Sequence, residues 1–60
     1  MKNYLDVEIF FKGLLWANYQ AKSVEIVTIF NSPQLHIVTI NGKELFYSMR
    51  YVSAVFARNE

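Results

Sequence analysis

The clearest pattern near the start of the chain is an alternation of apolar and polar positions with a period of two residues. Between Leu5 and Phe11 the apolar residues are separated by Asp6 and Glu8, so that successive side chains point to opposite faces of an extended strand. A helix capped by Asn3 is the competing interpretation. Because valine, isoleucine and paired phenylalanines favour extended structure, we expect a strand over Leu5 to Phe11.

The longest run of strand-forming sequence extends from Val24 to Phe56 and predicts a meander of short antiparallel strands. Asn41-Gly42 is its strongest turn signal, because a two-residue type I′ turn needs a positive φ at both central positions. Such a loop sets the register of the two strands that it joins. The expected pairs are Ile40 with Lys43, Thr39 with Glu44, Val38 with Leu45, Ile37 with Phe46 and His36 with Tyr47.

A second turn is expected at Asn31-Ser32-Pro33-Gln34, where Pro33 presets its own φ and directs Ser32 away from the helical region. A four-residue hairpin loop here gives the pairs Phe30 with Leu35, Thr28 with Ile37 and Val27 with Val38. Both faces of the resulting sheet are apolar, whereas an antiparallel sheet usually keeps one polar face. The pattern does not say which face is the core, and it predicts that the other face needs a partner.

The remaining segments complete an all-β prediction. Lys12-Gly13 marks a turn, and Leu14 to Lys22 is expected to pair back on the first strand with Trp16 facing Ile9. The same residues are good helix formers, so a short helix is the alternative for this segment. The last strand is expected from Tyr51 to Ala57. The ends of the chain are expected to be irregular: Met1 to Asn3 is frayed and Arg58 to Glu60 is a polar tail.

Several short strands with tight turns in 60 residues predict a single domain over residues 1–60. We expect an all-β fold in the form of a small, strongly bent antiparallel sheet or barrel. Hydrophobic residues make up 53% of the chain and there is no cysteine, whereas a domain of this size buries only about 60% of its unfolded surface. A homo-oligomer, in which one copy covers the apolar surface and strand edges of the next, is therefore expected.

The charge pattern indicates only a weak electrostatic attraction of one copy for nucleic acid. The net charge is +1 and the basic residues are scattered along the chain. A ring of several copies would gather them into a patch. No secretory signal is expected, because Asp6 and Glu8 interrupt the first apolar run, and the polar turn within Ile26 to Gly42 prevents that stretch from crossing a membrane as a helix. A soluble, cytoplasmic protein without a membrane partner is expected.

The residues that carry enzyme chemistry are few. His36 is the one histidine, and it lies in the middle of a predicted strand, without the nucleophile and orienting group of a triad. The ligand spacing of a zinc site is absent, and Gly13 and Gly42 form no phosphate-binding loop. Asp6 and Glu8 share one strand face, where solvation explains them better than acid–base catalysis. We expect no enzyme activity, no cofactor and no metal.

The aromatic residues suggest binding instead. Aromatic rings beside basic residues stack the bases of single-stranded nucleic acid. Arg50-Tyr51 is the best such pair, because it lies at a break between two predicted strands. Most other aromatic residues of a small β domain belong to its core or to an interface.

The C-terminal half resembles the end of Sm-like, Hfq-like proteins over residues 35 to 56, LHIVTINGKELFYSMRYVSAVF. Val52-Ser53-Ala54-Val55 matches the final strand of that family. Ser48-Met49-Arg50 takes the place of its basic Tyr-Lys-His signature, in which Arg50 keeps a positive charge. The family's Asp-centred motif between the second and third strands is missing, and Phe30-Asn31 stands there.

The resemblance implies an Sm-like, or more generally SH3-like, small β-barrel that assembles edge to edge into a homo-oligomeric ring. It also implies binding of single-stranded RNA without catalysis. The RNA-binding residues are then expected to be Arg50, Tyr51, Met49, Asn31 and His36. The alternative is a structural or protein-interaction module that assembles on itself, or on another protein, through apolar strand faces and edges.

Overall fold

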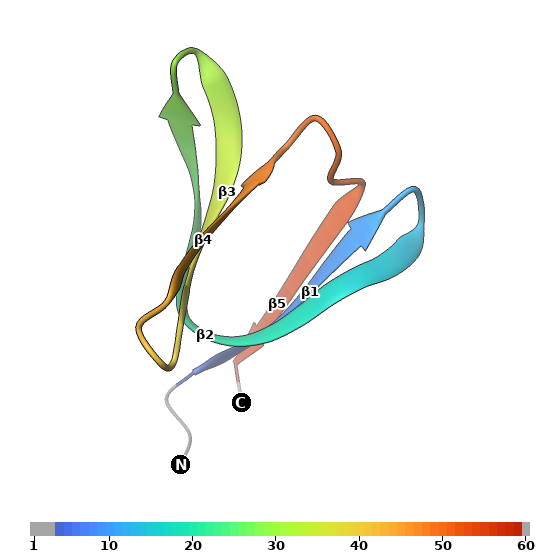
Figure 1. Cartoon of the computed structure of the whole chain (residues 1–60). Coiled ribbons are helices and arrows are strands. Elements are labelled where there is room, and N and C mark those ends of the chain that lie inside the picture. Colours follow the sequence, from blue (N-terminus) through green and yellow to red (C-terminus); the bar gives the residue numbers. More distant parts are fainter. Residues whose placement is uncertain (1–3, 60) are drawn as a thin grey trace.

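The computed structural model describes residues 4–59, and within this range the chain forms one five-stranded antiparallel sheet (Figure 1). Its strands are β1 (Leu5–Phe11), β2 (Leu14–Ile29), β3 (Ser32–Thr39), β4 (Glu44–Ser48) and β5 (Ala54–Asn59). The spatial order is β4-β3-β2-β1-β5, so β4 and β5 are the edges and the bent sheet does not close into a barrel. The all-β prediction is confirmed, and the expectations for Met1 to Asn3 and for Glu60 lie outside the described residues.

A single long strand, β2, joins the two halves of the sheet. Its first half pairs with β1 and its second half with β3, and the register shifts between Ala21 and Ser23, where Lys22 is the extra residue. An extra residue of this kind is a β-bulge, which bends its strand and increases its twist. Figure 1 shows β2 curving through this region. The strand prediction for Leu14 to Lys22 is confirmed, and the helix alternative is wrong.

A second bulge lies near the first turn. Phe10 pairs with Leu15 but Ile9 pairs with Ala17, so Trp16 is the extra residue on β2. The expected pairing of Trp16 with Ile9 is therefore wrong. The turn itself is as predicted, because Lys12 and Gly13 both have positive φ, 53° and 80°.

The turn between β2 and β3 is shorter than expected. Phe30 and Asn31 form a two-residue turn, both with positive φ, and Ile29 already pairs with Ser32. Leu35 therefore lies opposite Ile26 instead of Phe30. The shift from the predicted register is an even number of residues, so each side chain keeps its face although its partner changes. Pro33 lies at the start of β3, a strand position that proline tolerates.

The hairpin between β3 and β4 differs from the prediction by one residue. Val38 pairs with Glu44 and His36 pairs with Phe46, because Asn41-Gly42 lies within a longer loop. Thr39 closes that loop, where its N–H donates to the Lys43 carbonyl at 2.9 Å. A shift of one residue moves every side chain of a strand to the other face. The expected pairs across this hairpin are therefore wrong.

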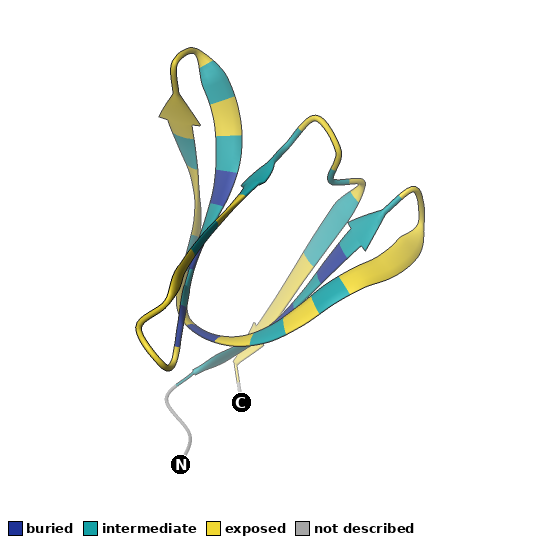
Figure 2. Ribbon diagram, in the orientation of Figure 1, coloured by how far each residue is buried: buried dark blue, intermediate teal, exposed yellow. Residues whose placement is uncertain are grey.

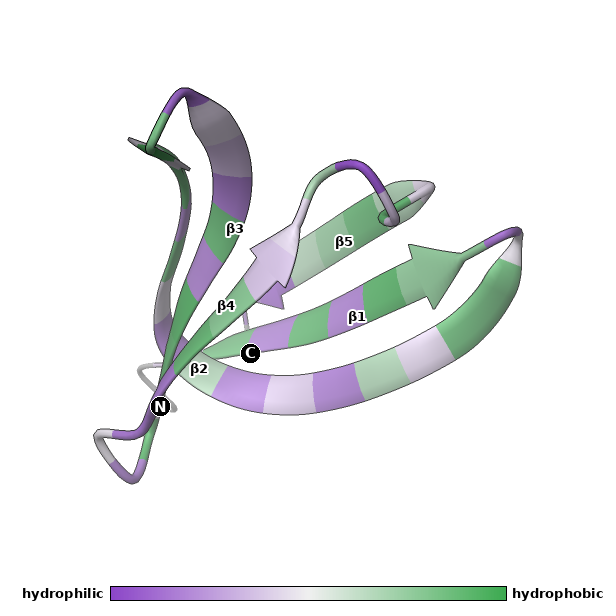
Figure 3. Cartoon of the chain, turned by 45° about the horizontal axis from the view of Figure 1, so that its top comes forward, coloured by the Kyte–Doolittle hydropathy of each residue, from purple (hydrophilic) through white to green (hydrophobic). Residues whose placement is uncertain are grey.

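The core fills the inside of the bend. Within residues 4–59 its fully buried apolar side chains come from three strands: Val7 and Ile9 of β1, Ala21 of β2, and Leu35 and Ile37 of β3. In Figure 2 the buried stretches lie on β1, β2 and β3, and Figure 3 shows the alternation of apolar and polar residues along β1. The half-buried side chains of Leu45 and Tyr47 pack around them.

The outer face of the sheet mixes polar side chains with apolar ones such as Phe46, which is 50% exposed, so the expectation of two apolar faces holds in part. Opposite the core, Glu25, His36 and Phe46 lie side by side on β2, β3 and β4. The last strand also differs from the prediction. It begins at Ala54 instead of Tyr51, and it includes Arg58, whose guanidinium pairs with Glu8 at 3.1 Å.

The observed register of β4 predicts unequal losses of stability for two neighbouring substitutions. Leu45→Asn places an amide among core side chains, so we expect the free energy of unfolding to fall by roughly 2–4 kcal/mol. Phe46 is 50% exposed on the outer face, so Phe46→Asn should cost less than about 1 kcal/mol. Urea unfolding of both variants measures the difference, and a larger loss for Phe46→Asn would favour the two-residue loop instead.

Candidate functional site

Two segments that are far apart in the sequence meet at one end of the sheet. The Ser53 backbone N–H donates to the Phe10 carbonyl at 2.8 Å, and the Gly13 N–H donates to Ser53 Oγ at 3.2 Å. These bonds hold the β1–β2 turn against the connection between β4 and β5. The aromatic rings of Phe11 and Tyr51 lie 6.3 Å apart across the junction.

The junction carries a surface that we call the basic-aromatic surface, formed by Phe11, Lys12, Arg50 and Tyr51. With Val52 and Ser53, these residues line a pocket of about 330 Å³. Lys12 and Arg50 are exposed, and neither makes an ion pair with any residue in the range 4–59. Arg58, by contrast, has its carboxylate partner. Both cations of the surface therefore remain available to an anionic ligand.

Local backbone chemistry explains the position of Arg50. The Tyr51 N–H donates to the Ser48 carbonyl at 3.1 Å, and the Arg50 N–H donates to Ser48 Oγ at 3.3 Å. Ser48 thus closes a turn that presents the next residues to solvent. On the other side of the surface, the Lys12 ammonium lies 5.5 Å from the centroid of the Phe11 ring. That distance is within the range of a cation–π contact.

The aromatic side of the surface continues along the open side of the sheet. The ring of Phe11 lies 5.4 Å from that of Trp16, and Trp16 lies 5.0 Å from Tyr47 in an edge-to-face arrangement. Trp16 is 49% exposed because the bulge displaces it from the regular pairing of β2. Arg50 and Tyr51 were predicted from the sequence, whereas Phe11 and Lys12 were not, since nothing in the order of residues shows that the two segments touch.

The other predicted binding residues lie elsewhere. Met49 packs against the core, and Asn31 is in the β2–β3 turn. His36 lies on the outer face, where its ring stacks on Phe46 at 4.5 Å and its Nε2 lies 3.0 Å from Glu44 Oε1. Arg50 and Tyr51 therefore share the basic-aromatic surface, whereas the side chain of the adjacent Met49 packs against the core, and Asn31 and His36 lie on other parts of the sheet.

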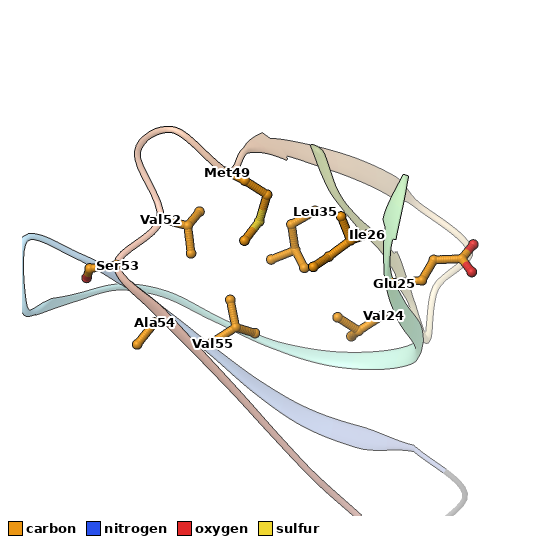
Figure 4. A pocket seen from close by; sticks show the side chains of 9 residues that line it. All are labelled: Val24, Glu25, Ile26, Leu35, Met49, Val52, Ser53, Ala54 and Val55. Atoms are coloured by element: carbon orange, nitrogen blue, oxygen red, sulfur yellow. The ribbon is translucent and has the colours of Figure 1, made fainter. Parts of the chain in front are cut away.

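An apolar pocket of about 470 Å³ opens inside the bend. It lies between the second half of β2 and the start of β5, and Figure 4 shows the side chains that surround it. Most of its lining is aliphatic: Val24, Ile26, Leu35, Met49, Val52, Ala54 and Val55. In Figure 4 the carboxylate of Glu25 points away from this space. We call this feature the apolar pocket.

The phenol of Tyr47 has an altered acidity. Burial disfavours its charged form, and a hydrogen bond with Tyr19 and the charge of Tyr19 act in the same direction, which together raise the pKa of Tyr47 from 10.0 to about 12. The two hydroxyl groups join β2 to β4 across the inside of the sheet.

Other elements of a chemical site are missing from the described part of the chain. Residues 4–59 contain no group of three or more histidine, cysteine, aspartate or glutamate side chains that is placed to hold a metal ion. Over the same range, no helix is long and apolar enough to cross a membrane.

The raised pKa of Tyr47 predicts a loss of stability at high pH. The native state favours the neutral phenol of Tyr47. The contribution of this phenol to the free energy of unfolding is therefore complete below pH 10 and disappears as the pH rises through about 12. Tyr47→Phe keeps the ring but cannot ionise there, so its free energy of unfolding should fall less between pH 10 and 12. Urea unfolding across this range measures the effect. Tyr51→Phe, at an exposed position, should retain the wild-type decline, and equal declines in all three proteins would contradict the assignment.

Comparisons of the chain with protein-family models, curated proteins and solved structures found no match. The resemblance to Sm-like proteins therefore stays a prediction, and the arguments for function that follow depend on the site itself.

Proposed function

We propose that this protein binds single-stranded RNA, without catalysis, through the basic-aromatic surface. The observation that carries the proposal is the meeting of Lys12 and Arg50 beside the rings of Phe11 and Tyr51 around one pocket. Proteins that bind single strands combine cations along the backbone with aromatic rings on which bases stack. Two cations and two rings within one small surface supply both elements.

Each part of the surface has a distinct role in this proposal. The exposed ring of Tyr51, 53% accessible, offers a face for one base, and the Phe11 ring supports it from the side. Lys12 and Arg50 contact the phosphates on either side of that base. Because the net charge of one chain is only +1, one copy binds weakly, and an assembly of several copies would bind more tightly through multiple contacts.

The proposal predicts a specific salt dependence. Fluorescence anisotropy with a short, labelled, uridine-rich RNA measures affinity at several salt concentrations. Arg50→Ala and Lys12→Ala should each lower the slope of log affinity against log salt by about 0.7, since each removes one phosphate contact with a single strand. Tyr51→Ala should weaken binding by roughly 1–3 kcal/mol at every salt concentration, through the loss of stacking.

Lys43→Ala is the matched control. It removes the same charge from the β3–β4 loop, which is not part of the basic-aromatic surface. Its affinity and salt slope should remain close to those of the wild type. Absence of binding at low salt, or equal effects of Lys43→Ala and Arg50→Ala, would contradict the proposal.

A second candidate function is a protein-interaction module that assembles with copies of itself. The observation that favours it is the number of large apolar side chains on the surface: Leu14, Leu15, Trp16, Ile26, Ile29, Phe30, Ile40, Phe46, Tyr51 and Phe56. Monomeric proteins seldom expose apolar patches of large area. The free edges of β4 and β5 in the described sheet add backbone groups that another strand can bind.

Native mass spectrometry of the wild type over a range of concentrations tests this second candidate. We expect oligomers that dissociate on dilution, because part of this exposed apolar surface becomes buried between copies. A monomer at every concentration would remove self-assembly from consideration.

A further inference from the structure

Phe30 is an unusual residue for its position, because it neither suits the backbone of its turn nor packs into the core of the chain. It is 99% exposed, and its φ of 49° lies in the left-handed region. Asparagine and glycine are preferred at such positions, and a bulky side chain there is an outlier. Backbone outliers of this kind often mark functional sites. The neighbouring Ile29 is 37% exposed, so the end of the hairpin is an apolar projection, which we call the apolar tip.

The apolar tip cannot reach the apolar pocket of its own chain. Ile26 lines that pocket, and Phe30 lies four residues farther along the chain, in the turn just past the end of β2. At up to about 3.4 Å per residue, the tip lies as much as roughly 14 Å beyond the pocket edge. Figure 1 shows the β2–β3 turn at the far end of its hairpin, projecting from the sheet. A ligand for the pocket and a cover for the tip must both come from outside the chain.

From these two features we infer that the apolar tip of one copy inserts into the apolar pocket of a second copy. The inference rests on self-assembly, the second candidate function, and names the contact that produces it. The pocket volume of about 470 Å³ lies in the range that holds a drug-sized molecule. It therefore has room for an aromatic ring together with part of Ile29.

Charge also fits this contact. The hairpin from Ile26 to Leu35 contains no charged residue, and the carboxylate of Glu25 points away from the pocket (Figure 4). The tip can therefore enter without burying an unpaired charge, which would otherwise oppose the contact. A basic or acidic partner segment would not have this advantage.

The geometry of the contact determines how copies assemble. One aromatic side chain buries only about 150–250 Å², far less than the roughly 1,200–2,000 Å² of a stable interface. Each copy, however, carries one tip and one pocket and thus takes part in two contacts. Two copies can exchange tips reciprocally, or successive copies can form a closed ring. Both arrangements bring the flanking strands of neighbouring copies together.

A pair of complementary variants tests the contact. Phe30→Asn removes the ring and suits a positive φ, so the variant should fold at least as stably as the wild type. Ile26→Asp places a charge at the edge of the pocket, at a side chain that is 62% exposed, and leaves Phe30 unchanged. Phe46→Asn is the control, since it removes an exposed ring from the outer face, away from the pocket.

Sedimentation velocity and native mass spectrometry measure self-association, and urea unfolding checks the fold of each variant. Phe30→Asn and Ile26→Asp should each raise the dissociation constant by about tenfold or more, as expected for the loss of an aromatic anchor. Phe46→Asn should leave it unchanged. In an equimolar mixture of Phe30→Asn and Ile26→Asp, mixed dimers should form more readily than either variant associates alone, because the first variant keeps a pocket, the second keeps a tip, and a mixed pair retains one of the two contacts.

Each other result would overturn the inference. If both variants dissociate and their mixture does not associate, the tip and the pocket act in separate symmetric contacts. If Phe30→Asn assembles like the wild type, self-assembly stands but uses another surface. If the control dissociates as well, the association is not specific to this contact. A monomeric wild type would remove both self-assembly and the proposed contact, and the tip would then serve a different protein.

Discussion

The bend in β2 is the constraint on which the rest of this small structure depends. The described residues form one sheet, and a single sheet can bury an apolar face only by folding over itself. The bulge at Lys22 allows this bend, and Ala21, just before it, is fully buried. Because alanine adds only a methyl group at that point, side chains from β1 and β3 can meet over it. Val7 and Ile9 from one side and Ile37 from the other then form the core.

The arrangement of strands around this bend accounts for both of the surfaces that we associate with function. Because β5 pairs with β1, the first hairpin turn lies against the connection before β5, where Ser53 bonds to Phe10 and Gly13. The basic-aromatic surface forms at that contact. Farther along, the sheet stays open, and Met49 and Val52 line a pocket that the chain does not fill. A short chain has too few residues to complete its own core, so binding at the open side would complete the packing that folding leaves unfinished.

The turns show how local preference and core burial compete. Asn41-Gly42 favours a two-residue turn, which would pair Glu44 with Thr39. Thr39 lies on the core side and is only 8% exposed, so that register would direct a carboxylate towards the core, at a high energetic cost. The longer loop instead places Leu45 inside and Glu44 beside His36. At Phe30-Asn31 the reverse occurs: a two-residue turn forms although the local sequence does not favour one. A two-residue turn there matches the twist of the strands and adds pairs up to Ile29 and Ser32, despite an unfavourable phenylalanine.

The all-β class could be predicted from the sequence alone, as could the approximate position of each strand and the turns at Lys12-Gly13 and Asn41-Gly42. These features follow from local rules: a period of two residues, β-branched composition, and the ability of glycine and asparagine to adopt a positive φ. The sequence also predicts Arg50 and Tyr51 as a binding pair. Which face is the core depends on tertiary packing. Strands with apolar residues on both sides give no local indication of which side becomes buried. Tertiary packing also places Lys12 and Phe11 beside Tyr51, since β5 pairs with β1 and thereby sets the connection before β5 next to the first hairpin turn.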